Sequence, residues 1–203
     1  MKKRIAVVSV DMHRGHLDPE VATLPLLPAE RCDKVIKTTA KFFKDLREKE
    51  VPIVHVVTTY RNSKESLSNP HWKKKNDEPN STRKGMERHN LEGSVQAEVI
   101  PELYEQGDYI VNTKKRYSCF YQTDLEFLLR RYLEVDAVII TGINTSSCCL
   151  NTGFEATNRD FKVYMVKDCM DSMDGPEFHE AALMLMERII GEVVTAEELL
   201  AKL

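Results

Sequence analysis

The 203-residue sequence has few of the features that mark membrane or nucleic-acid-binding proteins. No apolar run approaches the ~20 residues that a membrane-spanning helix needs, and the valine-rich start has no small-residue cleavage site of a signal peptide. The 29 Lys and Arg residues are balanced by 32 Asp and Glu residues, so the excess positive charge that phosphate backbones attract is missing. We therefore expect a cytoplasmic protein that binds neither membranes nor nucleic acids.

Cysteine is also sparse and shows no pattern. The five residues are Cys32, Cys119, Cys148, Cys149 and Cys169, an odd number without Cys-x-x-Cys spacing, and the six histidines are scattered. Neither a disulfide framework nor a cysteine-based metal site is predicted. A chain of this length can bury enough apolar surface for a core without either. The thiols are expected to be reduced, so the question is whether one of them is reactive.

Short apolar runs alternate with helix-length amphipathic segments along the chain. Strands are predicted at 5–10, 52–57, 109–112, 137–141, 162–166 and 193–194, and helices at 29–49, 124–133, 147–158, 177–189 and the C-terminus. Strands that alternate with helices indicate a parallel sheet covered on both faces. We expect one α/β domain over residues 1–203, with three layers and a mostly parallel six-stranded sheet.

One segment, at about 59–93, interrupts this alternation. It contains Asn, Ser, Pro and Lys with a lone Trp72 and little periodicity, and it is far longer than the ~2–6 residues of a usual connection in such folds. A floppy insertion is one interpretation. A lid or subunit contact over the active site is the other, because long ordered loops in compact domains are often functional.

Three chemically capable residues stand at predicted strand ends. Asp11 ends the first strand, Lys114 follows the strand 109–112, and Cys148 comes shortly after the strand that Gly142 closes. In open parallel sheets ligands bind beyond the carboxyl ends of the strands. Each residue alone also has a structural explanation, as a cap, a solvated charge or a small packing side chain. Together they suit nucleophilic catalysis, in which Asp11 shuttles the proton of the thiol.

Of the two neighbouring cysteines, Cys148 is the stronger candidate for the nucleophile. Residues 141–148 pass from strand to helix through residues that cap helices well, which places the thiol in the first helical turn. The unpaired N–H groups there and a nearby Lys114 favour a thiolate, and the same N–H groups can hold an oxyanion. Cys149 is expected to pack the helix onto the sheet.

The segments Val-Ser-Val-Asp11-Met-His, Asn-Thr-Lys114-Lys-Arg-Tyr117-Ser-Cys-Phe120 and Gly142-Ile-Asn-Thr-Ser-Ser-Cys148 resemble the three signatures of the isochorismatase-like cysteine hydrolases. Their order and their positions at strand ends match, and the resemblance covers nearly the whole chain. It implies a three-layer fold and a catalytic triad of Asp11, Lys114 and Cys148. It also implies a cis peptide bond between Ile143 and Asn144, with the backbone N–H groups of Asn144 and Cys148 as the oxyanion hole.

The sequence departs from the family pattern after Asp11. The family usually has Met-Gln-Asn-Gly-Phe there, whereas this chain has Met-His13-Arg-Gly-His16. His16 thus takes the place of an aromatic pocket residue, which suggests a more polar substrate, although a purely local role for His16 is equally open. The candidate substrate-binding residues are His16, Trp72, His89, Tyr117 and Phe120.

No metal or other cofactor is expected. Nicotinamidases in this family hold a metal through an Asp and two His residues after the second strand, and no Asp-x-His pair follows His55 here. The Asp11-x-His13-x-x-His16 spacing resembles a ligand cluster, but no predicted helix brings both histidines to one face.

The resemblance, together with Cys148, implies hydrolysis of a C–N bond in a small amide, carbamoyl or ureido compound through a thioester. The relatives that suggest this are nicotinamidases, carbamoylsarcosine amidases and ureidoacrylate hydrolases. Vinyl-ether hydrolysis of the isochorismatase type, which works without the cysteine, is one alternative. A non-catalytic member or a thiol-redox protein that uses Cys148 and Cys149 is another. A homo-oligomer, either dimer or tetramer, is expected by analogy with the family.

Overall fold

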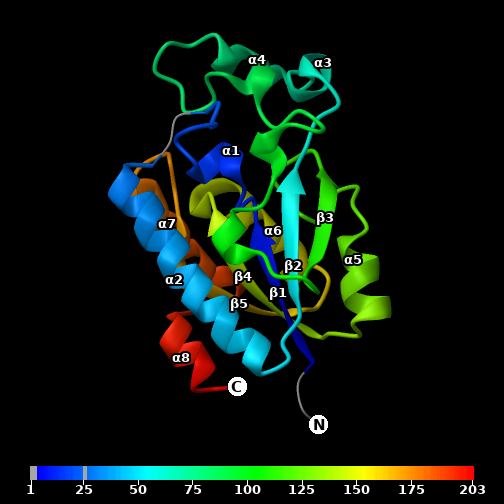
Figure 1. Cartoon of the computed structure of the whole chain (residues 1–203). Helices are drawn as coiled ribbons and strands as arrows, with labels where there is room; N and C mark the ends of the chain where they lie inside the picture. Colours follow the sequence, from blue (N-terminus) through cyan, green and yellow to red (C-terminus); the bar gives the residue numbers. More distant parts are fainter. Residues whose placement is uncertain (1–3, 25–26) are drawn as a thin grey trace.

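The computed structural model describes residues 4–24 and 27–203, and a six-stranded sheet forms its centre (Figure 1). The strands are β1 (Ile5–Val10), β2 (Ile53–Thr58), β3 (Tyr109–Lys114), β4 (Ala137–Ile143), β5 (Lys162–Asp171) and β6 (Glu192–Val194). They lie in the order β3-β2-β1-β4-β5-β6, and every pair of neighbours is parallel. The predicted α/β fold with a six-stranded sheet is confirmed.

Four strands extend beyond their predicted ends, among them β2 to Thr58 and β3 to Lys114. β4 continues to Ile143 and β5 to Asp171, and the ladder between them shifts register between Ile140 and Gly142. The apolar run of β5 is interrupted at Lys167 and resumes in its buried last residues. A sequence pattern that stops at the first charged residue therefore misses the second half of the strand.

Helix α2 (Ala29–Glu48) covers one face of the sheet, together with α8 (Ala196–Leu200). Val35, Phe42, Phe43 and Leu46 recur at helical spacing and are buried on this face, while the other side of α2 is charged. Within residues 4–24 and 27–203, no helix combines the length and apolar character needed to cross a membrane.

The opposite face carries the remaining long helical segments. They are α5 (Leu125–Phe127) with η4 (Leu128–Tyr132), α6 (Leu150–Thr157), and α7 (Pro176–Leu185) with η6 (Met186–Ile190). Leu125, Leu129, Ala156, Ala182 and Met186 from these segments join the buried core on this side. Two apolar clusters therefore enclose the sheet, which gives the three layers that the alternating pattern predicts.

The segment 59–93 has structure of its own. It contains α3 (Ser63–Ser66), α4 (Pro70–Asn76) and η1 (Met86–Arg88), while α1 (Arg14–Leu17), η2 (Val95–Ala97) and η3 (Pro101–Leu103) lie outside it. Tyr60, Trp72 and Met86 form a small apolar cluster with Leu24. Figure 1 shows α3 and α4 above the end of the sheet at which β2 stops. This segment is therefore positioned at the carboxyl edge, where ligands bind in such folds.

Candidate active site

The strand order explains how residues far apart in sequence meet. Lys114 ends β3, Thr58 ends β2, Asp11 follows β1, and β4 leads into the turn that carries Cys148. Because β3, β2, β1 and β4 are consecutive neighbours, these four residues line up along one edge of the sheet. The chain runs outward from β1 to β2 and β3 on one side and to β4 on the other, so the site lies at the topological switch point.

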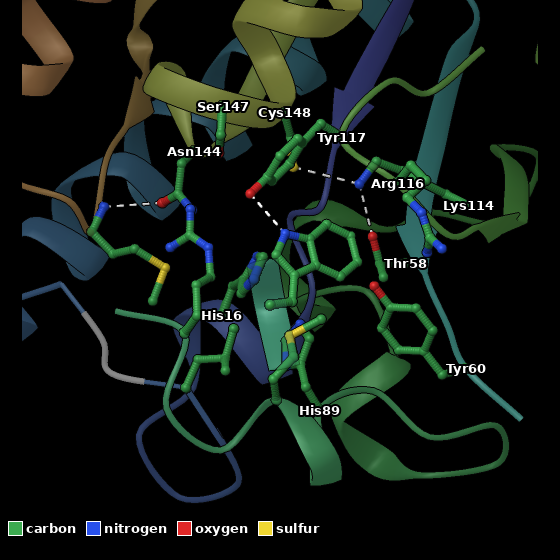
Figure 2. Close-up of a pocket in the computed structure, with 15 residues that line it drawn as sticks. His16, Thr58, Tyr60, His89, Lys114, Arg116, Tyr117, Asn144, Ser147 and Cys148 are labelled. Atoms are coloured by element: carbon green, nitrogen blue, oxygen red, sulfur yellow. Dashed lines mark hydrogen bonds between the residues drawn. The ribbon is translucent and has the colours of Figure 1, made fainter. Parts of the chain in front are cut away.

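Lys114 connects the other three residues of this edge. Its Nζ lies 2.5 Å from Asp11 Oδ2. Figure 2 shows its contacts to Thr58 Oγ1, at 2.8 Å, and to Cys148 Sγ, at 3.5 Å. Thr58 also donates to Asp11 Oδ1, at 2.9 Å from its backbone N and 2.8 Å from its hydroxyl. The Asp11 and Lys114 side chains are each only 1% exposed. The structure thus brings together the three side chains that the sequence analysis singled out.

The backbone at Asp11 turns sharply to place its carboxylate. Its φ is 51°, a left-handed conformation that Asp tolerates better than most residues. The N–H of Asp11 donates to Val56 O, and its carbonyl faces His16 Nδ1 at 3.3 Å. The strand end is therefore held on both sides of the carboxylate.

Asp11 and Lys114 form an ion pair despite their burial. Burial alone would raise the pKa of Asp11, but the charge and hydrogen bond of Lys114 hold it below its usual value. Burial alone would lower the pKa of Lys114, but the charge of Asp11 raises it. Both groups are charged at neutral pH, which is the state needed for a carboxylate to accept a proton.

The thiol of Cys148 is protonated in this environment. Burial raises its pKa to about 11, against the lowering effect of the Lys114 charge, while the Asp11 charge raises it further. The Lys114 charge lowers the pKa of Cys148 as expected, but burial outweighs it and the Asp11 charge opposes it, so the expected thiolate does not form in the free protein. An ionised Asp11 beside a protonated thiol fits a base that removes the S–H proton when attack begins.

Cys148 lies in the first helical turn, η5 (Thr145–Cys149), which continues into α6. Before it, Gly142 has φ 125°, and a Cβ there would approach Val10 O to 2.0 Å, so only glycine allows β4 to pass β1 so closely. The bond Ile143–Asn144 is cis, as the resemblance implies. The Asn144 side chain accepts from Met173 N at 2.9 Å, which fixes the residue whose backbone N–H the resemblance assigns to the oxyanion hole.

A small cavity of about 40 Å³ opens at Cys148 (Figure 2). Four of the five candidate substrate-binding residues line it: His16, Trp72, His89 and Tyr117. Trp72 Nε1 donates to the Tyr117 hydroxyl at 2.8 Å, which joins the segment 59–93 to the chain that follows β3. Residues of that segment therefore form part of the cavity wall.

Phe120, the fifth candidate, is not at the cavity. It is 4% exposed, belongs to the core under the helices, and stacks on Phe161 with ring centroids 5.9 Å apart. Its place in the motif near Lys114 suggested a pocket wall, but the turn after Tyr117 directs it inward. Cys149 also faces the core, with its Sγ 3.9 Å from Thr141 O.

The sequence analysis missed several residues of the cavity. Thr58 could have been found by the strand-end argument if β2 had been extended by one residue. Arg83 and Met86 come from the segment without periodicity, and Met173 follows the unpredicted second half of β5. No sequence signal marks these last three, because their role depends on how loops fold over the sheet.

Three buried histidines lie beside Asp11: His13, His16 and His89. The rings of His13 and His16 stack with centroids 4.2 Å apart, and those of His16 and His89 with centroids 4.9 Å apart. The sequence argument that nothing brings His13 and His16 together is therefore wrong, because α1 does so. Their ligand atoms all lie within 4.8 Å of one another, which raises the question of a metal.

The hydrogen bonds around these rings do not fit a three-histidine metal site. Asn90 Nδ2 donates to Thr58 O at 2.8 Å and lies 2.9 Å from His13 Nε2, so this nitrogen accepts and Nδ1 carries the proton. The rings of His16 and His89 are within 22° of parallel, so their in-plane lone pairs run side by side instead of converging on one ion. We assign no step of the reaction to a metal.

The structure thus combines a three-layer α/β fold with a buried Cys, Lys and Asp and a cavity at the carboxyl edge of the sheet. A family model for the isochorismatase domain matches residues 5–198. The chain belongs to the isochorismatase family of hydrolases.

Relatives and solved structures agree with this assignment. The chain is 27% identical over 199 residues to the isochorismatase family protein YwoC of Bacillus subtilis, covering 98% of this chain and 93% of that protein. The structure is similar to N-carbamoylsarcosine amidase from Thermoplasma acidophilum, with TM-score 0.73, 23% identity and coverage of 95% and 96% of the two chains. It is also similar to nicotinamidase PncA from Bacillus subtilis, with TM-score 0.75, 22% identity and coverage of 94% and 99%. At these identities the structural likeness establishes the fold.

Proposed function

We propose that this protein is a cysteine hydrolase that cleaves a C–N bond of a small amide, carbamoyl or ureido compound and releases ammonia or an amine. The observation that carries the proposal is the buried Asp11–Lys114 ion pair, whose ammonium lies 3.5 Å from the Cys148 sulfur at the wall of a cavity. This arrangement supplies a nucleophile, a proton acceptor and a fixed positive charge at one point.

In the first half of the reaction Asp11 accepts the S–H proton as Cys148 attacks the substrate carbonyl. The new S–C bond gives a tetrahedral oxyanion, for which the N–H groups of Asn144 and Cys148 are the proposed donors. Lys114 keeps its charge throughout and stabilises the sulfur as negative charge develops on it. Asp11 then gives the proton to the leaving nitrogen, the C–N bond breaks, and a thioester remains on Cys148.

Water completes the reaction by the reverse proton path. Asp11, ionised again, accepts a proton from a water that attacks the thioester carbonyl. The second tetrahedral intermediate collapses with cleavage of the C–S bond, and the Asp11 proton returns to the Cys148 sulfur. The acid product leaves, and the site is restored to its starting protonation state.

The histidines at the cavity suit a substrate that presents N–H groups. With the proton of His16 on Nδ1 facing Asp11 O, its Nε2 carries a lone pair. Burial lowers the pKa of His16 to about 4, so this nitrogen stays an acceptor at neutral pH. We propose that His16 accepts from an amide or ureido N–H, with Trp72, Tyr117 and His89 enclosing the substrate.

The test is a screen for ammonia release with nicotinamide, N-carbamoyl amino acids, ureidoacrylate, biuret and maleamate. Wild type and the variants Cys148→Ala and Cys149→Ala are compared. We expect turnover of at least one compound by wild type and Cys149→Ala, and none above background by Cys148→Ala. Equal activity of wild type and Cys148→Ala on every cleaved compound would contradict the nucleophile assignment. Consumption of a vinyl ether that survives in Cys148→Ala would favour the isochorismatase-type reaction instead.

We also propose that the protein forms a homo-oligomer. Phe178, Met184, Leu185 and Ile189 on α7 and η6 are each at least 45% exposed, which is a large apolar area for one helical face. A sedimentation mass of a dimer or tetramer is expected, and a monomer across the micromolar range would contradict the proposal.

A further inference from the structure

The wall of the cavity at Cys148 carries charge of one sign. Its lining includes Arg83, Lys114 and Arg116 but, among the described residues, no Asp or Glu. The two histidines of the wall add no charge, because burial lowers the pKa of His16 to about 4 and that of His89 well below its usual value. A cavity enclosed by low-dielectric walls and cations favours a negatively charged occupant.

The three cations differ in how their charge is balanced. Lys114 is paired with Asp11 behind the cavity wall. Arg116 donates to Lys115 O at 2.7 Å and to Ser68 Oγ at 3.1 Å and lies over the Trp72 ring, with no carboxylate partner among the described residues. Arg116 is therefore an unbalanced charge at the cavity.

Arg83 forms an ion pair with Asp174, which balances its charge and holds its side chain in place. Its side chain is 14% exposed, and its Nη1 donates to Thr82 Oγ1 at 2.9 Å and to Asp174 Oδ1 at 3.2 Å. Asp174 is fixed in turn by Ser146 and Thr82 hydroxyls at 2.9 and 2.7 Å. The Nη2 group makes only a long contact of 3.5 Å to Asp174 Oδ2, and no described acceptor takes the Nε proton. Donors of the planar guanidinium fork are therefore available to the cavity.

Arg83 also lies close to the reacting atoms. Its charge opposes the larger effect of burial, which raises the pKa of Cys148, and adds to the larger effect of burial, which lowers the pKa of His16. Next to the nucleophile, the hydroxyl of Ser147 is buried at the cavity wall and has no hydrogen-bond partner. A buried donor without a partner is costly unless a ligand satisfies it.

We propose that the substrate carries a carboxylate as well as the scissile amide, and that Arg83 binds this carboxylate with help from the Ser147 hydroxyl and the Arg116 charge. The inference rests on the amide hydrolysis proposed above and names the substrate class of the same site. A guanidinium fork matches a planar carboxylate in two parallel hydrogen bonds. Arg83 and Cys148 line the same cavity, so the carboxylate and the scissile amide would lie a few bonds apart in a short molecule.

The test uses pairs of compounds that differ only in the charged group: N-carbamoylglycine with N-carbamoylglycinamide, and maleamate with maleamide. Wild type, Arg83→Gln, Arg83→Lys and Ser147→Ala are assayed for kcat and KM on each. The control is Arg88→Gln, which removes a 71% exposed arginine of the same segment. We expect wild type to favour the carboxylate of each pair. Arg83→Gln should lower kcat/KM for the carboxylates by about 10- to 100-fold, mainly through KM, and for the neutral partners by less than about 3-fold.

Arg83→Lys should recover part of the loss because it restores charge without the fork, and Ser147→Ala should have a smaller effect of the same selectivity. Equal losses on charged and neutral partners would assign Arg83 a structural role and overturn the inference. So would a wild-type preference for the neutral compounds.

If no compound releases ammonia, the proposed hydrolysis is wrong for these compounds. The carboxylate site is then tested by measuring binding alone. Calorimetry with Cys148→Ala then compares the same pairs. Tighter binding of the carboxylates, lost in Cys148→Ala/Arg83→Gln, supports a carboxylate site. Equal binding, or no binding of either member, overturns it.

Discussion

Asp11 and Asp108 are both buried carboxylates beside a cation, yet their surroundings differ. Asp108 accepts from Arg47 at 2.6 Å and from the backbone N of Glu105 at 3.0 Å, and it lies 3.2 Å from His55 Nε2. These contacts tie α2 to the turn before β3 at the amino end of the sheet. Neither Asp108 nor Asp11 lines the cavity, but the Lys114 partner of Asp11 does, whereas Arg47 and His55 do not.

Asp11 lies at the opposite, carboxyl end of the sheet, and its surroundings include a group that can react. It shares Lys114 with Thr58 and with a protonated thiol, and a cavity lies next to that thiol. Burial opposes ionisation of both carboxyls, yet hydrogen bonds from His55 and Arg47 lower the pKa of Asp108 to about 2. The charge and the hydrogen bond of Lys114 likewise lower the pKa of Asp11. A lowered pKa therefore does not distinguish a catalytic carboxylate from a structural one; the neighbouring nucleophile and cavity do.

Replacing each carboxylate by the amide of the same shape should give the largest difference in effect between the two sites. Asp11→Asn removes the proton acceptor and should lower kcat by about 10²- to 10⁴-fold. Asp108→Asn should leave kcat within about 2-fold but lower the free energy of unfolding by about 1–3 kcal/mol, because charged hydrogen bonds to Arg47 are lost. Steady-state kinetics and urea unfolding check both. Activity of Asp11→Asn within tenfold of wild type would show that Asp11 is structural, like Asp108.

Thr58→Val tests how far the Asp11 geometry depends on its hydrogen bonds. The valine keeps the shape and the backbone N–H but removes the hydroxyl that joins Lys114 Nζ to Asp11 Oδ1. We expect kcat to fall about 10-fold, which corresponds to the ~1.4 kcal/mol typical of one buried hydrogen bond. Thr59→Val, one residue later and outside the cavity lining, is the control. An unchanged kcat in Thr58→Val would show that Lys114 alone positions the carboxylate.

The histidines near Asp11 should make the carboxyl end of the sheet sensitive to acid. Burial lowers the pKa of His13 and His89 well below 6.5 and that of His16 to about 4. Between pH ~6.5 and ~4 the unfolded chain therefore binds protons that the folded protein excludes. Stability is complete above this window and declines as pH falls through it, by about 1.4 kcal/mol per pH unit for each histidine.

Urea unfolding at pH 7.5, 6.0 and 5.0 measures this decline. His16→Phe removes one titrating group, so its stability should fall less steeply with pH than that of wild type. Parallel pH dependence of the two proteins would contradict the assignment of His16 to this effect.

The sequence predicts the sheet, and the positions of Asp11, Lys114 and Cys148 at its carboxyl edge, because both depend on local patterns. Apolar β-branched runs mark buried strands, and in a parallel sheet the carboxyl ends of the strands lie at one edge. That the three residues are neighbours depends on the strand order, which the pattern does not give. The protonation state of Cys148 could not be obtained in the same way. It depends on how deeply the thiol is buried and on whether the Lys114 charge is already balanced.

The residues of the cavity wall are predictable only in part, because some of them depend on contacts between distant loops. His16 and Tyr117 follow strand ends closely and could be inferred, whereas Phe120, three residues after Tyr117, turns into the core. Arg83 lies in a segment without periodicity, and its position depends on a long-range bond to Asp174. Contacts between two loops leave no repeating signature in the sequence.

In the proposed reaction Cys148, and not its neighbour Cys149, carries a covalent intermediate. The most direct measurement is acid quenching of the protein during turnover of its best amide substrate, followed by mass spectrometry of the peptide that contains both cysteines. Cys149→Ala, which keeps the nucleophile, and Cys148→Ala, which removes it, are quenched in parallel. We predict an added acyl mass in wild type and Cys149→Ala that is absent from Cys148→Ala. An acyl adduct that persists in Cys148→Ala, or turnover by that variant at the wild-type rate, would contradict it.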